Sequence, residues 1–332
     1  MFDKSLITTN KNLLAFSAGV DSSALFFILL EKKINFDIII VDYNLRKQSK
    51  QEIQYAKELA KKYNKKIYLK TYEKNKFSEK LARDFRYEFF DEIIINNNYE
   101  SLITAHQLND QLEWFLMQLT KGAGLIELIG LNKISNRKNY KLFKPLLDIS
   151  KNELLDYLKN NNFKYFIDKT NVQNIYKRNY FRNNFSNQLI DEFEVGIKKS
   201  ISYLNKDINS LNNVKNSIYL DKLMFIEFFN DDFNLILRFV DKKLKEFGII
   251  ISSDTKNEIL KQKSIVISNK YCIEILGKHL YIAPYKNYKM SKKFKELCRI
   301  NKIPKNIRPY LFKKSEVEIN NFLKNRQKVT IK

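Results

Sequence analysis

Residues 13–23 (Leu-Leu-Ala-Phe-Ser-Ala-Gly-Val-Asp-Ser-Ser) constrain the fold more than any other stretch of this chain. A short apolar run ends at Phe16, a polar turn with one glycine follows, and residues 23–30 are apolar all round, which is typical of a buried helix or strand. A strand, a turn of small residues and a helix together hold phosphate well, because the N–H groups of the first helical turn lack partners and the helix dipole favours an anion. The sequence therefore predicts a phosphate-binding loop.

Polar side chains in this turn indicate how the phosphate is held. Ser17, Ser22 and Ser23 offer hydroxyl donors. The Asp21 carboxylate would repel a bare phosphate, so we expect Mg²⁺ between the two groups. A Walker A loop is excluded, because that pattern needs a second glycine followed by a lysine. The alternative for this stretch is an ordinary capped helix of the core.

The N-terminal part of the chain alternates between apolar strand patterns and helical patterns. Strands are expected at residues 13–16, 36–42, 66–70 and 101–104, and helices at residues 23–32, 50–63, 78–97 and 109–119. This alternation predicts an α/β fold with a doubly wound, mostly parallel sheet. Ligands bind at the carboxyl ends of the strands in such folds, which is where Ser17, Asp42, His106 and Asp110 fall.

The second half of the chain has a different pattern. A boundary is expected near residues 192–205, which separates a catalytic domain at residues 1–195 from a C-terminal region at residues 196–332. Helices are expected up to about residue 263, then three short strands at residues 265–268, 271–276 and 279–283, and a basic helix at residues 291–300. We therefore expect a helical or α+β C-terminal domain.

The chain is strongly basic, with 60 Lys and Arg against 37 Asp and Glu and a formal net charge of +23. Residues 286–332 carry 15 Lys and Arg against 3 Glu, so about half of the net charge lies in this tail. An AT-biased genome also raises the lysine content, so the distribution is more informative than the total. A basic tail favours RNA or DNA as a partner.

Nothing in the sequence indicates a membrane or an oxidising compartment. No apolar run approaches the length of a membrane span, and the N-terminus lacks the apolar region of a signal peptide. Cys272 and Cys298 form no metal or redox motif. We expect a cytoplasmic protein without a membrane partner.

Several short motifs follow the loop in order along the chain. They are Val-Asp-Tyr-Asn-Leu-Arg at residues 41–46, Ala-Arg-Asp-Phe-Arg-Tyr at 82–87, Thr-Ala-His-Gln-Leu-Asn-Asp-Gln-Leu-Glu at 104–113, Asp-Lys-Thr-Asn at 168–171 and Arg-Asn-X-X-Arg at 178–182. The loop itself resembles the pyrophosphate loop (PP-loop) of the N-type ATP pyrophosphatase superfamily. Together the motifs resemble tRNA(Ile)-lysidine synthetase over residues 12–185, and residues 292–308 resemble that family's C-terminal tRNA-binding region.

The resemblance implies a PP-loop ATPase fold and one reaction. The C2 oxygen of the wobble cytidine in a CAU-anticodon tRNA(Ile) attacks the α-phosphorus of ATP, and pyrophosphate leaves. The amine of free L-lysine then displaces AMP at C2, which gives lysidine. ATP and Mg²⁺ are the implied cofactors, tRNA(Ile) and lysine are the implied partners, and the sequence leaves a homodimer open.

The resemblance also implies roles for individual residues. Asp21, His106 and Asp110 are the expected catalytic residues, and Asp21 is the expected metal ligand. The expected ATP-binding residues are Ser17, Ala18, Gly19, Val20, Asp21, Ser22, Ser23 and Asp42. The residues expected to contact phosphate or tRNA are Arg83, Arg86, Arg178, Asn179 and Arg182.

Each of these residues also has a simpler interpretation. Arg83 and Arg86, spaced i and i+3, share a helix face that could be merely solvated. A lone histidine such as His106 is often structural, and Asp110 suits the charge at a helix N-terminus. Arg178 and Arg182 are also compatible with a surface turn.

The chain departs from the family pattern at a few positions. Ala18 stands where the family usually has glycine, which keeps the N–H donor but loses free access to positive φ. Tyr43 and Asn44 replace His and Gly, Asn109 replaces a second Asp, and Trp114 replaces Thr. These departures leave open a nucleotide- and RNA-binding protein without catalysis.

A related tRNA-modifying enzyme of the superfamily is the other alternative. A thiolating enzyme needs a reactive cysteine or an iron–sulfur site, and residues 1–200 contain no cysteine. The sequence therefore argues against thiolation.

Overall fold

The computed structural model describes residues 2–44, 48–73, 78–167, 177–211, 217–228 and 232–330. It divides into two compact units, Met1–Ile208 and Asn209–Lys332. The boundary expected at residues 195–196 falls within helix α8 (Asn187–Leu211), whose backbone is non-helical at Phe193.

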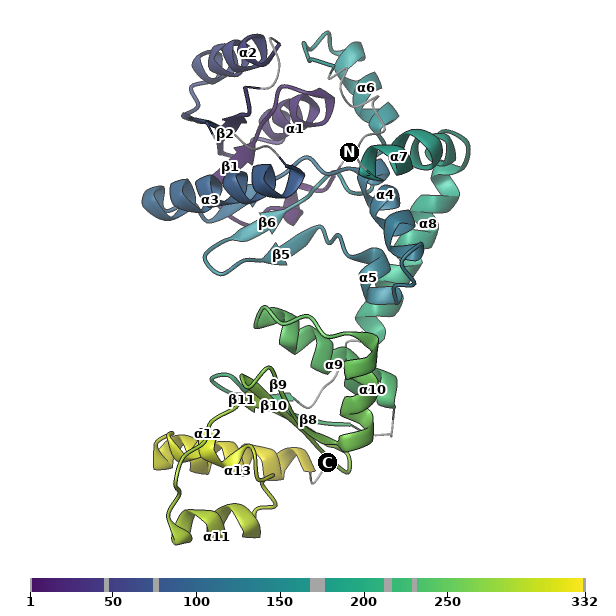
Figure 1. Cartoon of the computed structure of the whole chain (residues 1–332). Coiled ribbons are helices and arrows are strands. Elements are labelled where there is room, and N and C mark those ends of the chain that lie inside the picture. Colours follow the sequence, from purple (N-terminus) through teal and green to yellow (C-terminus); the bar gives the residue numbers. More distant parts are fainter. Residues whose placement is uncertain are drawn as a thin grey trace. The chain divides into compact units, whose positions relative to one another are not determined.

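The first unit is built on a six-stranded sheet with the strand order β3-β2-β1-β4-β6-β5. Its strands are β1 (Asn12–Ala15), β2 (Phe36–Asp42), β3 (Ile67–Thr71), β4 (Ser101–Ile103), β5 (Ile134–Asn136) and β6 (Lys141–Phe143). All neighbouring pairs are parallel except β5–β6, which is antiparallel. The predicted doubly wound, mostly parallel sheet is confirmed (Figure 1).

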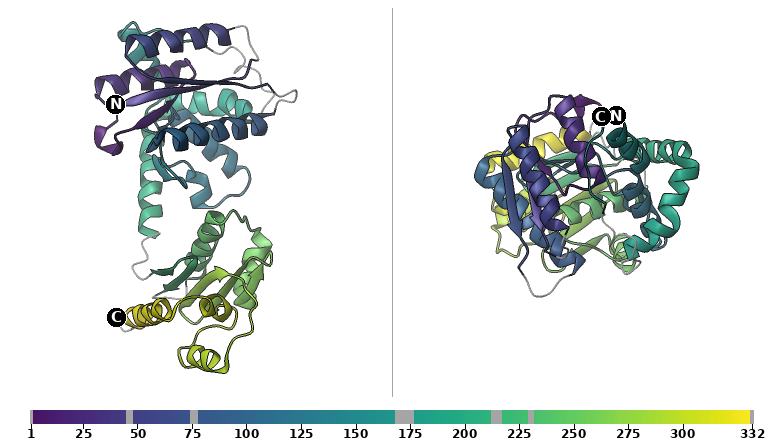
Figure 2. Two further views of the ribbon diagram at one scale, coloured as in Figure 1. Left: turned by 90° about the vertical axis from the view of Figure 1, so that its left-hand side faces the viewer. Right: turned by 90° about the horizontal axis from the view of Figure 1, so that it is seen from above.

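Helices cover both faces of this sheet (Figure 2). The helices of this unit are η1 (Lys4–Leu6), α1 (Val20–Glu31), α2 (Ser49–Lys62), α3 (Glu79–Asn97), α4 (Leu108–Leu119), α5 (Leu125–Ile129), α6 (Lys151–Asn160), α7 (Lys177–Phe181), the π-helical η3 (Arg182–Ser186) and α8. Those that pack on the sheet are α1, α2 and α6 on one face and α3 on the other. Leu14 and Ile38 pack with α1, α2 and α6, whereas their neighbours Leu13 and Ile39 pack with α3. Because β1 and β2 are buried on two sides, their sequences are mostly apolar.

The phosphate loop lies where β1 meets α1. Helix α1 begins at Val20, three residues before the expected start, because the extended backbone of Gly19 forms the N-cap. Asp21 and Ser22 consequently lie in the first helical turn. At the same edge of the sheet, the Thr104 N–H donates to the Phe143 carbonyl at 2.9 Å, which joins the ends of β4 and β6.

The second unit is an antiparallel sheet with the order β7-β8-β11-β10-β9. Its elements are β7 (Ser217–Leu220), β8 (Leu223–Glu227), α9 (Phe233–Glu246), α10 (Ser253–Gln262), β9 (Ser264–Ile267), β10 (Tyr271–Leu276), β11 (His279–Pro284), α11 (Lys292–Ile300), α12 (Arg308–Phe312) and α13 (Glu316–Thr330). The separate helical and sheet C-terminal region is therefore confirmed.

The expectation of only helices up to residue 263 is wrong, because β7 and β8 lie in that part of the chain. Met224 and Ile226 of β8 face a core shared with α9 and α10, and Leu223 and Phe225 face a core shared with α11–α13. A short strand buried on both faces shows no alternation, so its apolar run cannot be told from a helix by pattern. The β5–β6 hairpin, which is short and largely polar, was likewise not predicted.

Candidate functional site

The serine hydroxyls of the loop hold the loop itself together. The Ser17 N–H donates to Ser22 Oγ at 3.2 Å, and the two hydroxyls lie 3.1 Å apart. Ser22 Oγ also donates to the Gly19 carbonyl at 3.3 Å. Ser22 is buried, so its main contribution is to shape the turn that presents the first N–H groups of α1.

Ala18 adopts the left-handed backbone conformation, which alanine reaches less easily than the glycine usual at this position. Its φ is 57°, and the residue is fully buried. Its carbonyl accepts a hydrogen bond from the Phe166 N–H at 2.9 Å, so the segment after α6 secures the turn. A non-glycine residue in this region is strained, and the surrounding core holds it there.

Asp21 has the most unusual environment in the loop. Its Oδ1 atom is buried and has no hydrogen-bond partner in the described part of the chain. Burial raises the pKa of Asp21 to about 7, nearby Asp110 adds to this effect, and Lys151 and Arg182 oppose it. An orphaned carboxylate oxygen at a helix N-terminus is a suitable ligand for a hard cation that also binds phosphate.

Within the described ranges, no group of three or more His, Cys, Asp or Glu side chains is placed to hold a metal ion. A Mg²⁺ ion at Asp21 would therefore be completed by phosphate oxygens and water, which is the coordination that Mg²⁺ usually has beside nucleotides. The residues present fit the expected metal.

His106 follows β4 and faces Asp110 rather than the core. Its Nδ1 lies 3.0 Å from Thr104 Oγ1. Burial lowers the pKa of His106 to about 4, although Asp110 opposes the shift. The imidazole is therefore neutral at pH 7 and offers a hydrogen bond rather than a positive charge.

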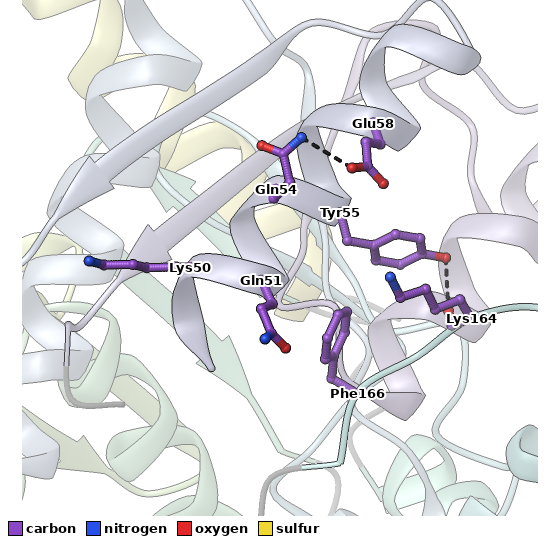
Figure 3. Close-up of a pocket in the computed structure, with 7 residues that line it drawn as sticks. All are labelled: Lys50, Gln51, Gln54, Tyr55, Glu58, Lys164 and Phe166. Carbon is purple, nitrogen blue, oxygen red and sulfur yellow. Dashed lines mark hydrogen bonds between the residues drawn. The ribbon is translucent and has the colours of Figure 1, made fainter. Parts of the chain in front are cut away.

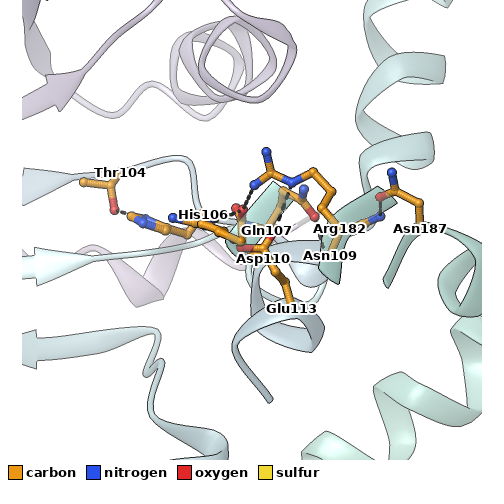
Figure 4. A network of polar contacts seen from close by, with 9 residues as sticks. Thr104, His106, Gln107, Asn109, Asp110, Glu113, Arg182 and Asn187 are labelled. Atoms are coloured by element: carbon orange, nitrogen blue, oxygen red, sulfur yellow. Dashed lines mark hydrogen bonds and ion pairs between the residues drawn. The ribbon is translucent and has the colours of Figure 1, made fainter. Parts of the chain in front are cut away.

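Two buried carboxylates of α4 bind two arginines from α7 and η3 (Figure 4). Asp110 Oδ1 accepts from Nη2 of Arg178 at 3.0 Å and from Nη2 of Arg182 at 3.2 Å. Glu113 Oε2 accepts from Nε of Arg182 at 2.9 Å, and Glu113 Oε1 accepts from Nε of Arg178. We call these four residues the carboxylate–arginine cluster.

The two carboxylates of the cluster have pKa values shifted in opposite directions, lowered for Asp110 and raised for Glu113. Burial tends to raise the pKa of Asp110, but the charges of Arg178 and Arg182 outweigh burial and leave this pKa lowered. For Glu113 burial outweighs both arginines, so its pKa is raised. Glu113 was not among the predicted site residues, although its i+3 spacing from Asp110 on α4 was a usable signal.

Asn109 replaces the family's usual aspartate and has a structural role here. Its side chain is buried, its Nδ2 donates to Asn187 Oδ1 at 3.1 Å, and its Oδ1 accepts from the Lys151 N–H at 3.1 Å. The amide thus ties α4 to the starts of α6 and α8, donating to one partner and accepting from the other.

The remaining predicted residues lie on other elements of the first unit. Asp42 caps its own turn by accepting from the Asn44 N–H at 2.8 Å. Arg83 and Arg86 lie on α3 beside the Tyr87 ring, and Asn179 lies on α7. Residues 45–46 and 168–171, which carried parts of the resemblance, fall outside the described residues.

A pocket of about 300 Å³ lies beside α2 (Figure 3). Its lining residues are Lys50, Gln51, Gln54, Tyr55, Glu58, Lys164 and Phe166. The Tyr55 hydroxyl donates to the Lys164 carbonyl at 2.8 Å, and this contact fixes the segment that leads to Phe166. None of the predicted site residues lines this pocket, so the candidate site remains the loop and the carboxylate–arginine cluster.

Comparisons with known proteins agree with this geometry. A family model described as a PP-loop domain matches residues 2–189. The tRNA(Ile)-lysidine synthase of Campylobacter jejuni strain RM1221 is 43% identical over 92% of this chain and 94% of its own length. That of Helicobacter hepaticus is 40% identical over 91% of this chain and 81% of its own length. The chain belongs to the tRNA(Ile)-lysidine synthase family.

Solved structures support the fold alone. The U34-tRNA thiolase NcsA from Methanococcus maripaludis matches with a TM-score of 0.52 at 17% identity, over 66% of this chain and 78% of that protein. Every helix in the described part of the chain is too short or too polar to cross a membrane.

The strain at Ala18 predicts that Ala18→Gly stabilises the protein by about 0.5–1 kcal/mol, because glycine adopts this backbone conformation freely. The matched control is Ala24→Gly, since Ala24 is equally buried but lies inside the right-handed helix α1. That variant is expected to lose about 1 kcal/mol or more. Urea unfolding of both variants measures the difference. Equal destabilisation by the two substitutions would contradict the argument.

The carboxylate–arginine cluster predicts that Glu113→Gln destabilises the protein by about 1–3 kcal/mol, because two guanidinium groups lose their charged partner at a buried position. Glu92→Gln is the control, since Glu92 pairs with Lys70 at 2.9 Å but both side chains are exposed. Its expected change is below about 0.5 kcal/mol. The same denaturant titration compares them, and a Glu113→Gln variant as stable as Glu92→Gln would refute the predicted contribution.

Proposed function

We propose that this chain is an ATP-dependent ligase that adenylates the wobble cytidine of CAU-anticodon tRNA(Ile) and joins free L-lysine to C2 of that base, forming lysidine. The observation that carries the proposal is the 43% identity to a tRNA(Ile)-lysidine synthase over 92% of the chain. The loop geometry and the unpartnered Asp21 oxygen are what such an adenylating enzyme needs. A tRNA substrate makes the cytoplasm the proposed location.

In the first step the C2 oxygen of cytidine attacks the α-phosphorus of ATP, and the bond to pyrophosphate breaks. The phosphates are proposed to lie at the N-terminus of α1, where free N–H groups point outward. Asp21 would hold Mg²⁺ through its buried, unpartnered oxygen. When bound, the metal supplies positive charge that stabilises the leaving pyrophosphate.

Arg178 and Arg182 contribute to the same step without leaving their carboxylates. A guanidinium has five N–H donors, and the cluster uses only the Nε and one Nη2 contact of each arginine. Among the described contacts the remaining donors have no carboxylate partner, so we propose that they bind phosphate oxygens of ATP or RNA. Neutral His106 is proposed to form one further hydrogen bond to the same phosphate oxygens.

In the second step the lysine amine attacks C2, AMP leaves, and the amine gives up a proton. A carboxylate such as Asp110 is one candidate acceptor of that proton. Its lowered pKa makes it a weak base, so we propose instead that ionised Asp110 attracts the lysine ammonium and orients the arginines. Asp110 thereby acts on the lysine ammonium before it is deprotonated, and the proton that the amine gives up passes to the phosphate of the departing AMP or to water.

The experiment that tests the function measures pyrophosphate release from Mg-ATP with a tRNA(Ile) transcript carrying the CAU anticodon. Lysine is added or omitted, labelled lysine is followed into the RNA, and a methionine tRNA with the same anticodon is the control. Release and incorporation limited to the isoleucine tRNA is the expected result. Release without incorporation would reject lysine as the nucleophile. No release would favour the non-catalytic binding protein.

Asp21→Asn is expected to lower the rate of pyrophosphate release by about 100-fold or more, because it removes the charge that holds the metal at the phosphates. Its tRNA affinity should be nearly unchanged, since RNA binding depends on basic side chains. Asp148→Asn is the control, because Asp148 is exposed and pairs only with exposed Lys133 at 2.7 Å among the described contacts. Wild-type turnover in Asp21→Asn would remove Asp21 from the mechanism.

A further inference from the structure

Three guanidinium groups surround one aromatic ring on the first unit. The Cζ atoms of Arg83, Arg137 and Arg86 lie 5.0, 5.5 and 5.8 Å from the centre of the Tyr87 ring. Cations within about 6 Å of a tyrosine ring are attracted to it, and this attraction holds extended arginine side chains in place. We call Tyr87 and the three arginines the Tyr87 cluster.

The Tyr87 cluster combines two elements that are distant in sequence. Arg83, Arg86 and Tyr87 come from α3, whereas Arg137 follows β5 in the hairpin that the sequence did not predict. The Arg137 N–H donates to the Tyr140 carbonyl at 2.8 Å, which closes the hairpin turn. The Tyr140 hydroxyl donates to Asp91 Oδ1 at 2.7 Å, which ties the hairpin to α3. The hairpin therefore places Arg137 against α3 by specific contacts.

Lys144 extends this positive charge toward the candidate site. It follows β6 directly, beside the end of β4 that carries Thr104. Its side chain is largely buried, and its Nζ donates to the Asn132 carbonyl at 3.4 Å. Burial lowers the pKa of Lys144 to about 8, and the charges of Arg137 and Arg83 contribute to the shift.

None of these four cations forms an ion pair with a carboxylate in the described part of the chain. Arg178 and Arg182 differ in this respect, because both form ion pairs with Asp110 and Glu113 that neutralise their charge. Like charges that converge without a counter-charge repel one another, and the arrangement gains stability when an anion binds. The Tyr87 cluster is therefore built for an external anion.

We propose that Arg83, Arg86 and Arg137 bind phosphate groups of the RNA backbone, with Lys144 adding to their positive charge, so that the β5–β6 hairpin is part of the tRNA-binding surface. The proposal rests on the proposed function, which supplies the RNA. Guanidinium groups match phosphate oxygens with paired hydrogen bonds. Arg83 and Arg137 are exposed, and β6 is separated from β1 and its phosphate loop by β4. These two features favour an extended polyanion over the phosphates of ATP.

The test compares Arg137→Ala with Lys138→Ala in the full-length protein. Lys138 is the next residue in the same turn, is equally exposed, and is not among the cations around Tyr87. The dissociation constant of the tRNA(Ile) transcript is measured across a salt series, and the KM for Mg-ATP is measured by pyrophosphate release. Arg137→Ala is expected to weaken RNA binding about 3- to 10-fold and to reduce the salt slope by about 0.7–0.9. Its KM for ATP should be unchanged.

Each other outcome overturns the proposal. An increased KM for ATP with unchanged RNA affinity would identify ATP as the source of the phosphate. Equal effects of Arg137→Ala and Lys138→Ala would mean that the hairpin contributes only general charge. Unchanged RNA affinity in Arg137→Ala, together with normal pyrophosphate release by the wild-type protein, would reject the Tyr87 cluster while leaving the proposed function intact. A wild-type protein that neither binds the tRNA nor releases pyrophosphate would reject both.

Discussion

The buried ion pairs between α4 and the α7–η3 segment are the interaction on which the candidate site depends. Asp110 and Glu113 lie where water has little access, and an ionised carboxylate is costly there unless charged donors contact it. Arg178 and Arg182 supply those donors from a segment about 70 residues later in the chain. Three of these side chains, Asp110, Arg178 and Arg182, also act on the pKa of Asp21 or of His106, so the electrostatics of this edge depend in part on this contact.

Two sets of arginines flank this edge of the sheet and differ in their counter-charges. The pair on α7 and η3 is matched by two carboxylates, so it can order the site before any substrate binds. The arginines around Tyr87 have an aromatic ring in place of a carboxylate, which orients them without cancelling their charge. A site that must bind a small nucleotide and a large polyanion at once needs both arrangements.

Local patterns predicted strands β1–β4 and β9–β11 and the turn between β1 and α1, because each depends on neighbouring positions in the chain. The strand at residues 36–42 was predicted with its observed ends. Other features depended on partners far away in sequence. Ala18 adopts φ 57° because the core and Phe166 hold it. Asn109 joins three helices because the Lys151 N–H donates to its Oδ1 and Asn187 Oδ1 accepts from its Nδ2. Strand β8 is buried on both faces by two separate groups of helices, so it lacks the alternation of apolar and polar residues by which a strand is predicted.

The sequence by itself determined the α/β class, the position of the phosphate loop, the family and the excess of positive charge, since composition and motifs are local properties of the chain. Only the tertiary structure decided which charges meet. It placed Glu113 beside Asp110 and against two arginines, and it left Asp21 with an unpartnered oxygen. It also brought Arg137 from a hairpin to the ring of Tyr87. The pKa of a carboxylate and the availability of an arginine depend on burial and on neighbours within a few ångströms, and those are set by packing between distant segments.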